Sequence, residues 1–422
     1  FSPWPDSSTG SPKTYWSVIE ATRQGFSNVI SDEDVAVDEL DKLLHRTVRR
    51  QMIADVKVGM FLSGGVDSTL VSAIAQREAR ERVRTFTIGF SESEYDESAY
   101  AEKIARHLDT EHLTVHVTPQ DSLQVIPDLA SIYDEPFADS SQIPAYLVSK
   151  IAREHVTVCL SGDGGDELFA GYNRYLSLDQ VWKKVGSVPL PARKLLGQML
   201  SVPPPGFWDK LYSGFSAIGG GKGEKQKLVG LKLQKLAGLI QQQDLMHGYE
   251  YLLSYWHDPE DLVSFRQVTA TVKPDITLPE SADFIETAMY LDQMGYLPGD
   301  NLTKVDRASM AVSLETRLPL LSYELLELSW RIPVSMKVRK KTSKWILRQV
   351  LYKYVPRHLI ETPKMGFSVP VAHWLRGELK GWAEDLLYSM KTCGGEFIRE
   401  SPVRKAWSEH LSGKRDHSHR LW

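Results

Sequence analysis

The sequence has few cysteines, no long hydrophobic run and no excess of positive charge, and each absence excludes a class of protein. Two cysteines, Cys159 and Cys393, are too few for a disulfide scaffold or a cysteine-rich zinc module, and they fit a reducing compartment. No apolar run approaches the roughly 18 residues that span a bilayer, and no signal-like segment precedes the globular pattern. The 50 basic and 54 acidic residues give a net charge of −4, which argues against coating a nucleic acid.

The composition that remains is that of an ordinary globular protein. Of the 422 residues, 42% are hydrophobic and 25% are charged. Residues 1–14 are rich in Ser, Pro and Gly and lack an apolar period, so we expect a linker or a trimmed edge there. We therefore expect a soluble, cytoplasmic protein whose folded part covers residues 15–422.

Strand-like and helix-like segments alternate over residues 35–175. The apolar spacing predicts a helix from Val35 to Gln51. Strands are then expected within 56–65, 84–90, 112–117 and 156–162, separated by helices over 68–81, 98–111 and 142–155. This alternation predicts an α/β fold: an open, mostly parallel sheet with helices on both faces.

The pattern changes after Tyr175. Residues 186–225 contain PLP, PPPG and GGGKGE and are expected to be mostly loop. From about 225 to 422 the apolar spacing is helical, without a convincing strand. We predict a nucleotide-type α/β core followed by a mainly helical half, about 176–422, that completes a cleft.

The strongest motif is FLSGGVDST, residues 61–69, between a buried strand and a helix. Gly64 and Gly65 allow a tight turn whose N–H groups can face an anion, and Ser63, Ser68 and Thr69 add hydroxyl donors. Asp67 is suited to hold Mg²⁺ rather than phosphate. The string lacks the P-loop pattern. The plainer interpretation is a strand-to-helix turn with two capping side chains.

A second motif, LSGDGGDELFAGY, covers residues 160–172 and also follows a buried strand. Asp163, Asp166 and Glu167 crowd a glycine-rich turn, and such repulsion is costly unless a cation or a catalytic duty offsets it. In a parallel sheet the carboxyl ends of neighbouring strands share one edge. Asp67 and Asp166 are therefore predicted to converge on one Mg-ATP. The plainer interpretation is an acidic surface loop.

Two further groups lie in the helical half. The stretch 296–321 carries Lys304, Asp306, Arg307, Glu315 and Arg317 among apolar residues, and these charges form either part of a site or a solvated helix face. Lys364, in a Pro-Lys-Met-Gly-Phe turn, is well placed to direct a charge into a cleft. Lys344, expected within the preceding helix, is either a second cation for phosphates or a surface lysine.

Taken in order, these motifs give the chain a family resemblance. Together with TFTIGF, DEPFADSS, VDRASMAVSLETRLPLL and PKMGFSVP, they resemble the synthetase domain of glutamine-hydrolysing asparagine synthetases, class B, members of the ATP pyrophosphatases. The resemblance covers nearly everything from Tyr15 to the C-terminus. It implies that ATP adenylates the side-chain carboxylate of aspartate, releasing pyrophosphate, and that ammonia then displaces AMP to give asparagine.

The resemblance also implies roles for individual residues. Asp67 and Asp166 would bind Mg²⁺, Lys364 would stabilise the departing phosphates and the acyl oxyanion, and Asp163 would manage the proton and the incoming ammonia. The pyrophosphate end of ATP would be held by Ser63, Gly64, Gly65, Asp67, Ser68 and Thr69, with Lys344 as a further cation. Adenine and ribose would be contacted by Leu62, Ile88, Ser161 and Gly162.

The chain also departs from the resembled family. Asp163 stands where many members have Glu, and Ser322 stands where Asp is usual, which would loosen a substrate-side contact. Residue 1 is Phe rather than the N-terminal cysteine nucleophile of a glutaminase, so these residues are not expected to hydrolyse glutamine. We expect a glutaminase domain upstream or as a separate subunit, and a homodimer is one expected assembly.

Other functions keep some of these features. Relatives of the family amidate sugar uronates in polysaccharides or close amide rings in peptides, with the same adenylation chemistry. A catalytically silent nucleotide-binding scaffold is disfavoured by the intact Asp67, Asp166 and Lys364. A tRNA-modifying pyrophosphatase is disfavoured by the acidic balance and by the lack of an appended basic module.

Overall fold

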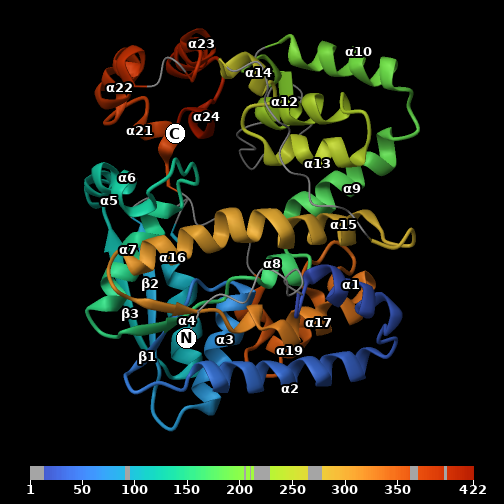
Figure 1. The fold of residues 1–422 in the computed structure, drawn as a ribbon, viewed down its shortest axis with the longest axis vertical. Coiled ribbons are helices and arrows are strands. Elements are labelled where there is room, and N and C mark those ends of the chain that lie inside the picture. The colour runs from blue at the N-terminus through green and yellow to red at the C-terminus, as the bar shows by residue number, and fades with distance from the viewer. Residues whose placement is uncertain are drawn as a thin grey trace, which may run out of the picture.

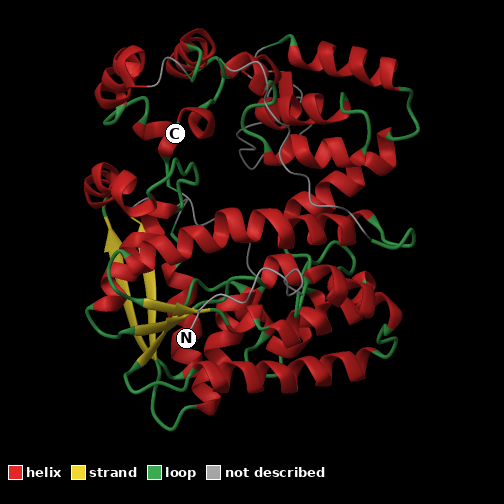
Figure 2. Cartoon of the chain, viewed as in Figure 1, coloured by secondary structure: helices red, strands yellow, loops and turns green. Residues whose placement is uncertain are grey.

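The fold is built on one sheet of five parallel strands, seen in yellow in Figure 2. The computed structural model describes residues 14–90, 96–203, 206–209, 211–212, 229–264, 278–361, 369–393 and 397–422. The strands are β1 (Val58–Phe61), β2 (Arg84–Phe90), β3 (Glu111–Val117), β4 (Val158–Leu160) and β5 (Glu315–Arg317). Their spatial order is β3-β2-β1-β4-β5. Strands β2 and β3 are thus added on one side of β1, and β4 and β5 are then added on its other side. The order reverses between β1 and β4, and ligands bind at such a switch point in open α/β sheets.

The inner strands β2 and β4 are buried on both faces, as parallel strands covered by helices are, whereas the edge strands β3 and β5 are more exposed. Six of the seven residues of β2 and all three of β4 are buried. Gly59 of β1 stands beside Arg84 of β2 and beside Cys159 of β4, which fixes the register of the central strands. Cys159 is fully buried, and burial raises the pKa of its thiol. This cysteine is therefore a small core residue.

Helices of the first half connect and cover these strands. Their bounds are α1 (Val18–Ser27), α2 (Glu33–Gln51), α3 (Val66–Glu78), α4 (Ser98–Leu108), α5 (Pro119–Val125), η1 (Ile126–Asp128), α6 (Leu129–Tyr133), α7 (Gln142–Arg153), α8 (Gly165–Leu168) and α9 (Asn173–Val185). The α/β alternation predicted for 35–175 is thus confirmed, and the predicted helix at Val35 begins at Glu33, capped by the Asp32 side chain.

The second half is mainly helical. Its elements are α10 (Leu190–Ser201), α12 (Val229–Ile240), α13 (Leu245–Leu253), α14 (Pro259–Leu262), α15 (Phe284–Leu291), the π-helix η2 (Asp292–Leu302), α16 (Thr303–Met310), η3 (Pro319–Leu321), α17 (Tyr323–Arg331), α18 (Val334–Lys337), α19 (Trp345–Leu351), α20 (Arg357–Ile360), α21 (Val371–Trp374), α22 (Lys380–Cys393), α23 (Glu400–Leu411) and α24 (Ser418–Leu421). Figure 1 shows α15, η2 and α16 end to end across the middle of the molecule, with the C-terminal helices above them. Within the described ranges, no helix is long and apolar enough to cross a membrane.

Two sequence expectations for this half are wrong. Residues 190–201, expected within a loop, form α10. The helical pattern read over 296–321 ends at Met310, and Ser313 takes a left-handed backbone (φ 58°) before the chain enters β5. β5 escapes detection because three residues, Glu-Thr-Arg, are too short to show an alternating pattern. The last strand of the sheet therefore comes from the helical half.

The core extends from the sheet to the C-terminal helices. One buried cluster joins α2 and α3 to α17 and α19. A second joins the end of β2, at Ile88 and Phe90, to Val371 and Trp374 of α21. The C-terminal segment is therefore packed against the ends of β2 and β3.

Candidate active site

The first glycine motif forms the turn between β1 and α3. Gly64 has a φ of 80°, a backbone conformation that suits glycine, and Gly65 is the N-cap of α3. The Ser63 and Ser68 hydroxyls lie 3.0 Å apart, and the Ser68 hydroxyl also accepts from the Ser63 N–H at 3.2 Å. The turn thus presents the N-terminal end of α3, where anions are favoured.

The second motif follows β4 and lies directly against the first. A Cβ atom on Gly162 would lie 2.6 Å from the Ser68 nitrogen, so only glycine allows the two loops this approach. The Ser161 N–H donates to the Arg317 carbonyl of β5 at 2.9 Å. The Ser161 hydroxyl donates to Asp163 Oδ2 at 2.5 Å. The predicted convergence of the two loops at the sheet edge is therefore present.

Lys344 joins the two loops. Its ammonium forms ion pairs with Asp67 and, at 2.8 Å, with Asp166 Oδ1. The side chain is buried, which disfavours its charge, but the Asp166 and Asp67 carboxylates outweigh burial and raise the pKa of Lys344. The sequence pattern predicts Lys344 within a helix, whereas it is the residue before α19, with a left-handed φ of 53°. This backbone conformation is costly for lysine and occurs at functional sites.

The two carboxylates fit a magnesium ion that is shared with a nucleotide. Because one ammonium contacts both, Asp67 and Asp166 lie close enough to act on the same cation. Among the described residues, no group of three or more His, Cys, Asp or Glu side chains is arranged to hold a metal. Mg²⁺ is usually bound by one or two carboxylates with substrate phosphates and waters. The two carboxylates therefore fit Mg²⁺ bound together with ATP.

Glu167 anchors the second loop in the interior. It is fully buried, and its Oε1 accepts from the Tyr172 hydroxyl and from Asn301 Nδ2, both at 2.6 Å. Gln293 Nε2 donates to the Glu167 carbonyl at 3.0 Å. Burial, with the neighbouring Asp166 charge, raises the pKa of Glu167 to about 7. Asn301 and Gln293 belong to the π-helix η2, a helix type frequent at functional sites.

A second charged group lies close enough to Asp163 to feel its charge. Lys304 of α16 donates to Asp139 Oδ2 at 2.8 Å and to Asn301 Oδ1 at 3.2 Å. Burial lowers the pKa of Lys304, but the Asp139 carboxylate outweighs burial and raises it, and Asp163 acts in the same direction. Of the charges noted over 296–321, Lys304 is the one that reaches the site. Asp139, in the quoted DEPFADSS string, received no role from sequence because its partner lies 165 residues away.

The remaining predicted residues are placed as follows. Leu62, the residue after β1, and Ile88, within β2, are buried, and Thr69 is fully buried in α3. Ser322 caps α17 by accepting from the Leu325 N–H at 3.3 Å, a task that Asp also performs. Lys364 lies outside the described residues.

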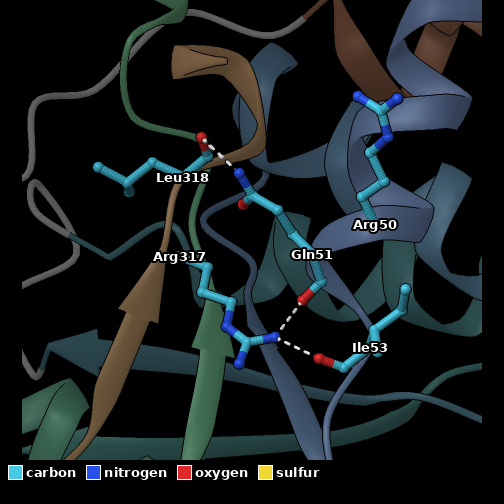
Figure 3. Close-up of a pocket in the computed structure, with 5 residues that line it drawn as sticks. All are labelled: Arg50, Gln51, Ile53, Arg317 and Leu318. Carbon is cyan, nitrogen blue, oxygen red and sulfur yellow. Dashed lines mark hydrogen bonds between the residues drawn. The ribbon is translucent and has the colours of Figure 1, made fainter.

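Arg317 has a different role from Lys304. Its guanidinium donates to the Gln51 and Ile53 carbonyls at 2.7 and 2.8 Å, and Gln51 donates to the Leu318 carbonyl at 3.4 Å (Figure 3). Together with Arg50 these residues line a surface pocket of about 490 Å³. Of the candidate residues noted in the sequence, Arg317 alone is among them, and none of the residues expected to bind ATP or Mg²⁺ is. The group ties the end of α2 to β5.

Comparison with known proteins gives one consistent family. The family model described as asparagine synthase matches residues 39–422. The chain is 32% identical over 415 residues to asparagine synthetase (glutamine-hydrolyzing) 1 of Bacillus subtilis, covering 97% of this chain and 60% of that protein. It is 34% identical over 408 residues to a putative asparagine synthetase (glutamine-hydrolyzing) of Mycobacterium tuberculosis H37Rv, covering 94% and 58%. The chain thus spans about 60% of the length of these relatives.

Proposed function

Because the chain belongs to the asparagine synthase family, we propose that it forms an amide from aspartate and ammonia with ATP. An oxygen of the aspartate side-chain carboxylate attacks the α-phosphorus of ATP, and pyrophosphate leaves. The nitrogen of ammonia then attacks the acyl carbon, AMP leaves with the bonding electrons, and the nitrogen loses a proton. The supporting observation is the convergence of Asp67, Asp166 and Lys344 at the switch point of the sheet.

The loops after β1 and β4 form the nucleotide side of this proposed site. Bound Mg²⁺ would offset the charge that accumulates on the leaving pyrophosphate. Asp67 and Asp166 would hold the ion, and the turn from Ser63 to Thr69 would bind the phosphates through N–H and hydroxyl groups. Lys344 already neutralises both carboxylates and would turn toward the phosphates when the ion takes its place. Leu62, Ile88, Ser161 and Gly162 would border the nucleoside.

Asp163 is our candidate for the proton of the second step. The Ser161 hydroxyl fixes Oδ2, so Oδ1 is the oxygen that we assign to the proton released by ammonia. Lys364 keeps its sequence-based role, stabilisation of the leaving group and of the acyl oxyanion. A glutaminase domain or subunit is our proposed source of ammonia.

The test is acceptor-dependent chemistry by the purified chain with Mg-ATP. Aspartate should support exchange of labelled pyrophosphate into ATP. When ammonium chloride is added, AMP and asparagine should be released. Exchange with a uronate or a peptide carboxylate, and none with aspartate, would replace this proposal by the corresponding amidotransferase. AMP formation with no acceptor at all would contradict both.

The nitrogen source is tested with the same chain. Ammonium chloride should support asparagine formation, increasingly so as the pH rises, because neutral NH₃ is the nucleophile. Glutamine should not support it. Release of glutamate from glutamine with no other protein present would contradict the proposed division of labour.

A further inference from the structure

The ion pair between Lys304 and Asp139 has the composition of a recognition site for a zwitterion. One cation and one anion lie 2.8 Å apart, and their side chains are 14% and 24% exposed. A second acid, Asp300, is close enough that burial and the Asp139 charge raise its pKa. Such a pair is costly to bury unless its geometry is well satisfied, so it is a weak device for stability alone.

The pair is rigidly connected to the nucleotide side through Asn301. The Asn301 side-chain amide donates to Glu167 Oε1 at 2.6 Å and to the Tyr172 hydroxyl at 2.9 Å, and its oxygen accepts from Lys304. Glu167 follows Asp166 directly in the chain. The Asn301 side chain, which bonds both Lys304 and Glu167, therefore fixes how far Lys304 lies from the loop that carries Asp166. The Tyr133 hydroxyl, which donates to the Lys304 carbonyl at 3.2 Å, holds the backbone as well.

We propose that Lys304 and Asp139 bind the α-carboxylate and the α-ammonium of the acceptor, so that the pair selects aspartate over carboxylates without an amine. This inference rests on the proposed function. On binding, the α-carboxylate of aspartate would take the place of Asp139 beside Lys304, and the α-ammonium would take the place of Lys304 beside Asp139. The side-chain carboxylate would then lie toward Asp163 and the nucleotide. A uronate, which has no ammonium group, would leave the Asp139 charge unsatisfied.

Two analogues of aspartate separate the two contacts. β-Alanine lacks the α-carboxylate, and succinate lacks the α-ammonium. Dissociation constants for aspartate and for both analogues are measured by calorimetry on the full chain with Mg²⁺ and a non-hydrolysable ATP analogue. Loss of one charged hydrogen bond typically costs a factor of about 10 to 100 in affinity.

The expected results are specific to each pair of variant and ligand. Lys304→Met should weaken aspartate binding about 10- to 100-fold, toward the level of β-alanine in the wild type, and should leave β-alanine unchanged. Asp139→Asn should also weaken aspartate binding about 10- to 100-fold, toward the level of succinate in the wild type, and should leave the binding of succinate unchanged. The double variant removes both charges, avoids a lone buried charge and should lose the preference for aspartate while binding the ATP analogue as the wild type does.

The results that overturn the inference differ from those that overturn the proposed function. Unchanged aspartate affinity in either single variant overturns the inference. So does an equal weakening of aspartate and β-alanine in Lys304→Met, or of aspartate and succinate in Asp139→Asn. Weakened binding of the ATP analogue would show a structural role instead. If the wild type binds and adenylates another carboxylate but not aspartate, the proposed function itself fails before any variant is tested.

Discussion

The proposed nucleotide side and the proposed acceptor side of this site are built from different kinds of structure. The nucleotide side is two contiguous loops that follow neighbouring strands, and the residues that we assign to Mg²⁺ lie within two short strings. The acceptor side, with Lys304, Asp139 and Asn301, takes its side chains from a π-helix, the helix after it and a loop 165 residues away. Phosphate binding needs backbone N–H groups at a strand end, whereas recognition of a small acceptor needs a few side chains in register. The first kind of site is local in sequence and the second is not.

The largest effect is expected on the nucleotide side. Asp67→Asn and Asp166→Asn should each lower AMP formation by about 10³-fold or more, because the pyrophosphate charge then lacks part of its counter-ion site. AMP release at fixed Mg²⁺ is the measurement. Asp38→Asn is the matched control, since Asp38 pairs with Lys42 on the surface of α2. Turnover near the wild-type level in either variant would contradict the metal assignment.

Lys344 tests whether the two loops need their shared cation. Lys344→Met should lower AMP formation about 10²-fold, and Lys344→Arg should retain part of the activity because the charge is kept. Lys341→Met, three residues earlier and exposed, is the control. Single-turnover kinetics measure the effect. If Lys344→Met behaves like Lys341→Met, the contact with Asp67 and Asp166 has no role in the chemistry.

Asn301 sharpens the comparison because it touches both sides. Asn301→Ala removes a hydrogen bond to Glu167 and one to Lys304, and we expect the KM for aspartate to rise roughly 5- to 30-fold. The KM for ATP should change by less than about twofold, since Tyr172 still donates to Glu167. Steady-state pyrophosphate exchange gives both constants. A parallel rise in both would mean that Asn301 supports the fold of the whole site.

A change away from both sides should alter stability without altering chemistry. Lys337 is buried, with its ammonium 5.2 Å from the centre of the Trp330 ring, and burial lowers its pKa to about 7 against the opposing effect of Glu286 and Asp283. Between about pH 7 and 10 the unfolded chain therefore binds more protons than the folded protein, so stability from this group rises with pH.

The slope contributed by Lys337 is at most about 1.4 kcal/mol per pH unit. Lys337→Met should remove this rise and be more stable than the wild type at pH 7. Urea unfolding at pH 7, 8 and 9 is the measurement, with AMP formation expected to stay at the wild-type level. Parallel pH profiles of wild type and variant would show that Lys337 remains protonated in the folded protein.

The comparison between the two sides also shows how far sequence could predict this protein. Strands β1 to β4 and the loops after β1 and β4 follow from hydrophobic runs and glycine-rich strings, which are local signals. β5 is too short for such a signal, and the position of Lys344 depends on a left-handed backbone that a lysine rarely adopts. The partnership of Lys304 with Asp139 depends on tertiary packing of α16 against α7, which neither sequence segment shows alone.

The origin of β5 has a consequence for how the protein is made. A ribosome that has completed β4 has produced four of the five strands of the described sheet, and the outer edge of β4 stays open until residues 315–317 emerge more than 150 residues later. An open strand edge is a template for pairing with another chain. The carbonyl of Arg317 that accepts from Ser161 arrives at the same moment, so the second motif acquires its final shape late in synthesis. A fragment that stops near Tyr175 should therefore aggregate rather than yield a small nucleotide-binding domain.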